Sequence, residues 1–301
     1  MQSKKIYKGV VVPAVTPLMA DYTLDEAAVE KMMANFRAHQ VTPFILGTTG
    51  EAPSLPYSVR HDYLKVAAGL KEPGQIIYAG ISSNCLEESV EFAHLCFESG
   101  IDVVVATPPG YYPLSAEQLQ NYFERLANLV PGPLMIYNIP ATTHISIPLE
   151  VIDALSHHPN IVGLKDSERN EERLKKALQL WSQRKDFCYF AGWAAKSAET
   201  LLNGGDGIIP STGNFHPALY NQMYAAAQQG NSEKAYELQK QSDVLGNLYQ
   251  AGRLLGESLW ALKVLMKKIG LCDTYMMPPL HQLSNEEEAK VLKGWEELLI
   301  S

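Results

Sequence analysis

Short apolar runs, rich in β-branched and aromatic residues, recur eight times along this chain of 301 residues. Each run is followed by a stretch with the periodicity of an amphipathic helix. Strands that alternate with helices predict a parallel sheet, because a parallel strand needs a crossover that returns to the same end of the sheet. Eight such units predict an α/β fold of one kind, the (β/α)8 TIM barrel. The predicted strands are residues 10–15, 43–46, 75–79, 102–106, 134–137, 161–164, 187–190 and 207–210.

Start signals precede several of the predicted barrel helices. Thr23 with Glu26, and Ser115 with Gln118, have the spacing of a capping box, in which each side chain bonds the backbone amide of the other residue. Pro148 suits the first position of a helix, where a missing N–H costs nothing. The sequence therefore predicts where three of these helices begin.

The chain changes character after residue 230, where the strand pattern stops and three helical stretches follow. They are separated near Ala251-Gly252 and by Pro278-Pro279. Ser284 and Glu287 form a capping box at the start of the last stretch. Its predicted apolar stripe consists of Val291, Leu292, Trp295, Leu298 and Leu299. We predict a catalytic barrel of residues 1–230 and a C-terminal helical appendage of residues 231–301 packed on it.

The charge pattern argues against partners with a phosphate backbone. The formal net charge is −8 and acidic and basic residues are interleaved, so the chain has no basic patch for nucleic acid. No window has the length and apolarity of a membrane span, and Pro13 and Pro17 interrupt the apolar stretch that follows residues 1–5. The four cysteines are scattered and form no CxxC pair. These features predict a cytoplasmic protein with no nucleic-acid or membrane partner.

A lysine and a tyrosine stand at the ends of neighbouring predicted strands, where barrels carry their active sites. Lys165 ends the sixth strand, and on strand parity it shares a face with Ile161 and Gly163, the glycine leaving space beneath it. Tyr137 ends the fifth strand on the same face as Met135. A lysine that loses hydration loses part of its preference for the ammonium form and can act as a nucleophile. The pair therefore predicts a reactive amine with an acid–base partner.

Ordinary structural roles compete with this interpretation. Lys165 could be a surface lysine paired with Asp166, and Tyr137 could be a half-buried tyrosine that bonds a backbone group. Taken singly, either role is the commoner one. Their joint position at adjacent strand ends favours chemistry.

Three loops at the same end of the barrel could contribute to a site. Gly47-Thr48-Thr49-Gly50-Glu51 could bind a carboxylate through its amides and hydroxyls, although an ordinary turn is as good an interpretation. Ser211-Thr212-Gly213-Asn214 follows the eighth strand, where many barrels bind phosphate. The loop of residues 107–113 is stiffened by prolines and presents Tyr111 and Tyr112, a pattern that more often marks an interface than a catalyst.

Metal chemistry has little support in the sequence. His157-His158 precedes the sixth strand and so lies on the opposite face of the barrel, while His144 and His216 lack further ligands nearby. No Gly-rich dinucleotide fingerprint follows a strand. We predict no metal and no cofactor.

Four motifs in order along the chain carry a family resemblance. They are Gly47-Thr48-Thr49-Gly50-Glu51, Tyr111-Tyr112, Tyr137-Asn138-Ile139-Pro140 and Gly163-Leu164-Lys165-Asp166-Ser167. Together they resemble the dihydrodipicolinate synthase/N-acetylneuraminate lyase family over essentially the whole chain. The resemblance implies a class I aldolase or synthase that forms a Schiff base, built on a TIM barrel with a C-terminal helical segment.

The resemblance implies catalytic roles for four residues. Lys165 matches the lysine that forms an imine with pyruvate or another 2-oxo acid, and Tyr137 matches the tyrosine that moves the proton of the aldol oxygen. Thr48 is the third of these residues, and its hydroxyl matches a donor to the 2-oxo acid at the same site. Tyr111 matches a tyrosine that completes the proton relay from a neighbouring subunit, which implies a homo-oligomer, either a dimer or a tetramer.

Substrate contacts follow from the same comparison of motifs. Thr48, Thr49 and Gly50 match the loop that holds the 2-oxo acid carboxylate, and Ile209 corresponds to a backbone carbonyl near the lysine.

Two departures from the family bear on the second substrate. Thr142 stands where dihydrodipicolinate synthases have an arginine for the carboxylate of aspartate semialdehyde, and a threonine cannot form that bidentate pair. Gly192 is followed by Trp193 where sialic acid lyases have an acidic pair that contacts sugar hydroxyls. Both departures point away from the two best-known reactions of the family.

The predicted function is therefore a cofactor-free, pyruvate-dependent aldolase that cleaves or forms a 4-hydroxy-2-oxo acid, with pyruvate and an aldehyde as small-molecule partners. The alternatives are dihydrodipicolinate synthase, which condenses pyruvate with aspartate semialdehyde, and a dehydratase of a 2-keto-3-deoxy sugar acid. A catalytically silent barrel that senses a 2-oxo acid, and a barrel that binds phosphorylated metabolites, are further alternatives of other classes.

Overall fold

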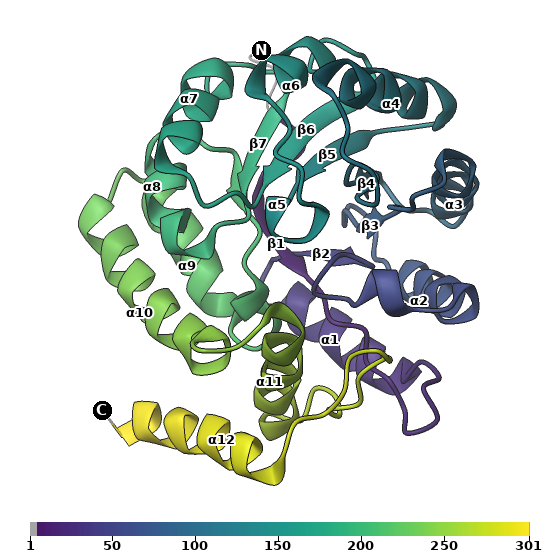
Figure 1. The fold of residues 1–301 in the computed structure, drawn as a ribbon. Helices are drawn as coiled ribbons and strands as arrows, with labels where there is room; N and C mark the ends of the chain where they lie inside the picture. Colours follow the sequence, from purple (N-terminus) through teal and green to yellow (C-terminus); the bar gives the residue numbers. More distant parts are fainter. Residues whose placement is uncertain (1–4, 301) are drawn as a thin grey trace.

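Eight parallel strands form a closed barrel at the centre of the computed structural model, which describes residues 5–300 (Figure 1). Each strand pairs with the next, and the last pairs with the first. The strands are β1 (Gly9–Pro13), β2 (Thr42–Ile45), β3 (Tyr78–Gly80), β4 (Val103–Ala106), β5 (Leu134–Asn138), β6 (Ile161–Asp166), β7 (Cys188–Ala191) and β8 (Gly207–Ile208). The predicted TIM barrel is confirmed, and every predicted strand overlaps an observed one.

Helices surround the barrel and fill the connections between its strands (Figure 1). They are α1 (Glu26–Ala38), α2 (Tyr57–Gly69), α3 (Leu86–Glu98), α4 (Ala116–Leu129), α5 (Pro140–Thr143), α6 (Leu149–Leu155), α7 (Glu171–Trp181), α8 (Ser197–Leu202) and α9 (Pro217–Gln228). Short 3-10 turns lie at η1 (Ala52–Ser54), η2 (Ala194–Lys196) and η3 (Ser211–Asn214). Among the described residues, no helix is both long and apolar enough to cross a membrane.

The helix start signals are partly confirmed. At α4 the capping box is complete, with the Gln118 amide donating to Ser115 Oγ over 3.2 Å and the Ser115 amide donating to Gln118 Oε1 over 2.9 Å. At α1 the predicted box is wrong, because Asp25 is the cap and accepts from the Ala28 amide. A carboxylate one residue before the helix outcompetes the more distant Thr23 hydroxyl. Pro148 lies one position before α6 instead of within it.

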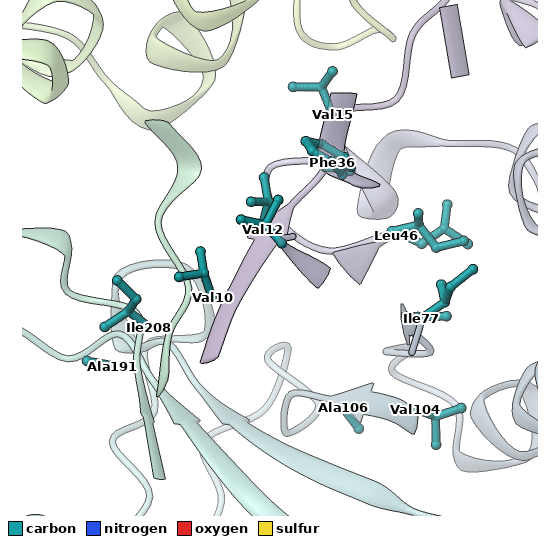
Figure 2. Packing of buried hydrophobic residues seen from close by; sticks show 14 of the residues in the cluster. Val10, Val12, Val15, Phe36, Leu46, Ile77, Val104, Ala106, Ala191 and Ile208 are labelled. Carbon is teal, nitrogen blue, oxygen red and sulfur yellow. The ribbon is translucent and has the colours of Figure 1, made fainter. Parts of the chain in front are cut away.

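The buried apolar side chains form two layers, one on the outer side of the strands and one inside the barrel. The outer layer fills the space between strands and helices, and Figure 2 shows part of it, including Val10 and Val12 on β1. The inner layer contains Val11, Phe44, Tyr78, Val103, Val105, Met135, Tyr137, Ile139, Cys188, Phe190 and Ile209. Met135 and Tyr137 of β5 thus point inward, as strand parity predicts.

The sixth strand departs from simple alternation near its start. Its pairing with β5 passes over Val162, so Ile161 packs in the outer layer and Val162 against the inner one. The predicted face of Ile161 is therefore wrong, whereas Lys165 points inward as expected. The predicted space at Gly163 is also wrong, because a Cβ there would lie 2.6 Å from the Cys188 carbonyl oxygen. This glycine allows β7 to approach closely.

Three helices follow the barrel, α10 (Ser232–Gln250), α11 (Leu255–Lys268) and α12 (Asn285–Ile300). In Figure 1 they run from light green to yellow along one side of the barrel, with α10 beside α8 and α9, and α12 beside α11. The Glu287 amide donates to Ser284 Oγ over 3.3 Å at the start of α12. Of the predicted stripe, Val291, Leu292, Trp295 and Leu298 pack on the core, and the side chain of Leu299 lies outside those described. The division into a barrel of residues 1–230 and an appendage of residues 231–301 stays a prediction.

Candidate active site

Lys165 and Tyr137 occupy paired positions on neighbouring strands at the C-terminal end of the barrel. The lysine is 3% exposed, and its Nζ lies 3.8 Å from the centroid of the Tyr137 ring and 4.9 Å from that of Phe44. A buried amine held over two aromatic faces is not a surface lysine, so that alternative is wrong. Nor does Lys165 pair with Asp166, which bonds another cation.

Burial and mutual charge shift the pKa values of both groups. Desolvation lowers the pKa of Lys165 below its ordinary value, although the neighbouring Tyr137 oxygen opposes this shift. Burial alone would raise the pKa of Tyr137. The charge of Lys165 and the hydroxyls of Thr48 and Ser167 outweigh this effect and hold that pKa below its ordinary value. Each group thus titrates below its ordinary value, and the two are coupled, since the charge of Lys165 is one cause of the lowered pKa of Tyr137. Such a pair suits a nucleophile beside a proton carrier.

A buried network fixes the strand end behind Lys165. Asp166 Oδ2 accepts from Arg173 Nε over 2.7 Å, and Oδ1 accepts from Asn138 Nδ2 over 2.8 Å. The Glu168 amide also donates to Asp166 Oδ1 over 3.1 Å. Burial raises the pKa of Asp166 even though Arg173 and Asn138 oppose the shift. With both carboxylate oxygens bonded, Asp166 anchors β6 to β5 and leaves Lys165 free of an ion pair with it.

The loop after β2 brings hydroxyl groups to the same place. Thr48 Oγ1 lies 3.4 Å from the Tyr137 hydroxyl, and Thr49 is nearly buried beside it. The left-handed backbone of this loop lies at Leu46 and Glu51, with φ of 56° and 59°, and not at its glycines. Gly50 instead supplies space, since a Cβ there would lie 3.0 Å from the Ala14 carbonyl oxygen. Its carbonyl accepts from the Thr16 hydroxyl, so Gly50 supports the loop from behind.

Glu51 has a structural partner that sequence reasoning did not find. Its Oε1 lies 2.5 Å from Lys263 Nζ, and both side chains have no exposed surface. Its Oε2 accepts from the Met277 amide over 2.8 Å, and Lys263 also donates to the Tyr275 carbonyl over 2.7 Å. The Thr48-Thr49 loop is thereby tied to α11 and the segment after it. The sequence contains one sign of this pair, because Lys263 stands inside the apolar run of residues 259–266, where a buried lysine needs a partner.

A cavity of about 730 Å³ opens above Lys165 and Tyr137. Of the residues predicted from sequence, it is lined by Lys165, Tyr137, Thr48, Thr49, Ile209, Gly192 and Trp193. Residues that the sequence did not indicate line it as well, among them Ser167, Arg169, Asn247, Gln250 and Arg253. Several of these come from the C-terminal helices, so that segment forms one wall of the site.

A second hollow of about 360 Å³ shares Thr48 and Tyr137 with the first. Tyr111 and Thr142 line this hollow and not the main cavity. Tyr111 is 75% exposed and packs edge-on against Tyr112, with ring centroids 4.8 Å apart. The Asn84 side chain accepts from the Tyr111 amide over 3.3 Å and so steadies the loop. The structure thus holds Tyr111 at the surface, on the hollow that Tyr137 also lines.

The hydroxyls of the loop after β8 are engaged internally. Ser211 Oγ lies 2.7 Å and Thr212 Oγ1 3.0 Å from the Tyr249 hydroxyl. The Asn214 side chain donates to the Pro13 carbonyl over 2.9 Å and accepts from the Val15 amide over 3.1 Å. These bonds hold the loop to α10 and β1. They weaken the prediction that it binds phosphate.

Comparison with known proteins decides the family. The model of the dihydrodipicolinate synthetase family matches residues 6–297. The chain belongs to this family. It is accordingly an enzyme of the lyase type, since its relatives are named as lyases, aldolases or synthases. The resemblance carried by the four motifs is confirmed.

Individual members of the family match this chain over nearly its whole length. An uncharacterised DapA-like lyase of Thermococcus kodakarensis is 31% identical over 94% of this chain and 97% of its own. A probable 2-dehydro-3-deoxy-D-pentonate aldolase of Escherichia coli K12 is 29% identical over 95% of this chain and 96% of its own. The structure of dihydrodipicolinate synthase from Bacteroides thetaiotaomicron has a TM-score of 0.91 and 29% identity, and covers 96% of this chain and 98% of its own.

Proposed function

We propose that this family member is a pyruvate-dependent class I aldolase that cleaves or forms a 4-hydroxy-2-oxo acid through a Schiff base on Lys165. The observation that carries the proposal is the buried Lys165 amine over the Tyr137 ring, in the wall of a cavity that Thr48, Thr49 and Ser167 also line. Burial lowers the pKa of Lys165 and so raises the fraction of neutral amine, the form that attacks a ketone.

In the cleavage direction, the Lys165 amine adds to the C2 ketone of the substrate. The Tyr137 phenol then gives its proton to the departing hydroxyl, so water leaves and a protonated imine and a Tyr137 phenolate remain. The Tyr137 oxygen takes the proton of the C4 hydroxyl, and the C3–C4 bond breaks. Its electron pair moves to C3 and on to the imine nitrogen, giving an enamine, while C4 leaves as an aldehyde. C3 then takes up a proton, and water hydrolyses the imine to release pyruvate and restore the amine.

The surrounding residues fit roles in binding and proton transfer. Thr48 and Thr49, on the loop held by Glu51, can donate to the carboxylate of the 2-oxo acid. Thr48 also contacts the Tyr137 hydroxyl and can pass its proton on. Ile209 offers its backbone beside Lys165. None of these roles requires a metal or a cofactor.

Tyr111 supports a proposal about assembly. Its exposed ring on a loop steadied by Asn84 is suited to enter the site of a second copy, where it would complete the proton relay. We therefore propose a homo-oligomer, at least a dimer. Sedimentation of the wild type against Tyr111→Ala tests this, because a monomeric wild type would contradict it.

Two features make the synthase reaction the weaker alternative. Thr142 offers a hydroxyl that already contacts the Ile139 carbonyl at 3.3 Å, in place of an arginine fork. Trp193 gives the main cavity an apolar wall next to Gly192. Thr142 thus offers no guanidinium at the family's arginine position, and the apolar wall at Trp193 offers no acceptor for the hydroxyls of a long polyol.

A coupled assay of pyruvate release across a panel of 2-keto-3-deoxy acids tests the proposal. Condensation of pyruvate with aspartate semialdehyde should be measured beside it, together with loss of water from a 2-keto-3-deoxy sugar acid. The proposal predicts cleavage of at least one acid of the panel, abolished in Lys165→Ala. Synthase or dehydratase activity that exceeds cleavage would replace it with that alternative.

A further inference from the structure

Two arginines line the main cavity in addition to the predicted catalytic residues. Arg169 follows β6, four residues after Lys165, and Arg253 lies between α10 and α11. We propose that they bind a carboxylate on the aldehyde half of the substrate, so that the substrate is a dianionic 4-hydroxy-2-oxo acid. This inference rests on the proposed function, because it assigns the far end of the same substrate.

Arg253 is held in place but is not saturated with partners. Its Nη1 donates to the Leu248 carbonyl over 3.2 Å, and Nη2 donates to Glu287 Oε2 over 3.1 Å. Its Nε is buried and has no hydrogen-bond partner among the described residues. Each Nη has a second N–H besides the one bonded to Leu248 or Glu287, so the fixed guanidinium can still engage a carboxylate in the cavity.

Arg169 is exposed, and within residues 5–300 it forms no ion pair. The acidic residue beside it, Glu168, also lines the cavity, but its carboxylate accepts from Ser146 over 2.6 Å and from Asn138 over 3.0 Å. It also lies 3.5 Å from Arg173 Nε. Glu168 is thus engaged elsewhere, and the cavity keeps an excess of positive charge.

The balance of charge favours a carboxylate over a phosphate. Glu287 offsets part of the charge of Arg253, which leaves Arg169 as the cation without a partner in the described part of the cavity. That suits a group with a single negative charge. A phosphate, with a charge near −2 at neutral pH, would need more donors than remain. The carboxylate of the pyruvate half has its own donors at Thr48 and Thr49, so the arginines remain for the other end.

The location differs from the one predicted by family resemblance. Thr142, at the position of the family's arginine, lines the smaller hollow and not the cavity that holds both arginines. The positive charge for a second acidic group therefore comes from the loop after β6 and from the C-terminal helices. This arrangement would select an acidic aldehyde that approaches from that wall.

The test compares two five-carbon substrates that differ at C5. One is 4-hydroxy-2-oxoglutarate, which ends in a carboxylate, and the other is 4,5-dihydroxy-2-oxopentanoate, which ends in a hydroxymethyl group. Pyruvate release gives kcat/KM for each. The wild type should prefer the acidic substrate by roughly tenfold or more, as expected for charge-assisted hydrogen bonds present in one case only.

Matched variants assign the preference to the arginines. Arg169→Gln and Arg253→Gln should each lower the ratio by roughly tenfold, while Arg169→Lys, which keeps the charge but loses the fork, should give an intermediate ratio. Lys185→Gln removes an exposed charge before β7, at the other end of the barrel, and should leave the ratio unchanged. Because Arg169 is exposed, its variants test the proposal even where Arg253→Gln does not fold.

A wild-type ratio near one, or one that the Arg169 variants leave unchanged, would overturn the inference. A higher kcat/KM for the 5-phosphate of the hydroxymethyl substrate would overturn the assignment to a carboxylate. Borohydride trapping of pyruvate on the wild type distinguishes failure of the acidic preference from failure of Schiff-base formation. Trapping without acidic preference refutes this inference alone, whereas failure to trap pyruvate refutes the proposed function.

Discussion

Removing Lys263 isolates a buried carboxylate, and the structure predicts a large cost. In Lys263→Met, Glu51 keeps the Met277 amide as a donor but loses its cation at a site with no exposed surface. The Tyr275 carbonyl loses its lysine donor as well. Breaking a buried pair by removing one partner costs about 3–5 kcal/mol, because a charge is left buried without compensation.

The cost converts to a measurable change in melting temperature. For a chain of 301 residues, the unfolding entropy near 60 °C is about 0.6 kcal/mol/K, so 3–5 kcal/mol corresponds to a lower Tm by about 5–8 °C. Urea unfolding followed by tryptophan fluorescence gives the free energy directly, and Trp260 on the same helix reports on this region. The loop of Thr48 and Thr49 should loosen too, which predicts a higher KM for the 2-oxo acid.

An exposed ion pair on the same helix is the control. Lys268 lies 3.2 Å from Glu296 and its side chain is 41% exposed, so Lys268→Met should change the free energy of unfolding by less than about 1 kcal/mol. The double variant Glu51→Leu/Lys263→Met should recover part of the loss, since no charge remains buried. If Lys263→Met were as well tolerated as Lys268→Met, the assignment of Glu51 as an anchor of the loop would be refuted.

Three further predictions concern the site and its strands. Tyr137→Phe should lower kcat by roughly 10²–10⁴ while pyruvate is still trapped on Lys165; a kcat close to that of the wild type would contradict the acid–base role. Because the Lys165 amine must lose its proton to attack, and its pKa is lowered, the trapping rate should rise with pH and reach its midpoint below the ordinary lysine value of 10.5. A midpoint at or above that value would count against desolvation. Gly163→Ala should destabilise the barrel by about 1–3 kcal/mol in urea unfolding, because its Cβ meets the Cys188 carbonyl; an unchanged midpoint would show that β7 can move away.

The eight strands could be predicted because each is a short, nearly continuous apolar run, as expected where both faces of a strand are buried. Strand ends then placed Lys165 and Tyr137 together, because the ends of parallel strands meet at one edge. The resemblance of motifs added Thr48, Thr49, Ile209 and the cavity wall at Trp193.

Details that depend on three-dimensional contact could not be predicted in the same way. The irregular pairing at Val162 changes which face Ile161 occupies, and a periodicity of two residues contains no sign of it. At α1 two capping groups compete, and only the backbone geometry decides for Asp25. Arg253 lines the cavity from the connection between α10 and α11, far along the chain, and Lys263 meets Glu51 across more than 200 residues of sequence.

Mass spectrometry after borohydride reduction in the presence of pyruvate tests the Schiff base on Lys165 most directly. The wild type should gain one reduced pyruvate per chain, located on the peptide that contains Lys165, and Lys165→Ala should gain none. A wild type that gains no pyruvate, or a Lys165→Ala variant that still gains it, would contradict the proposed mechanism.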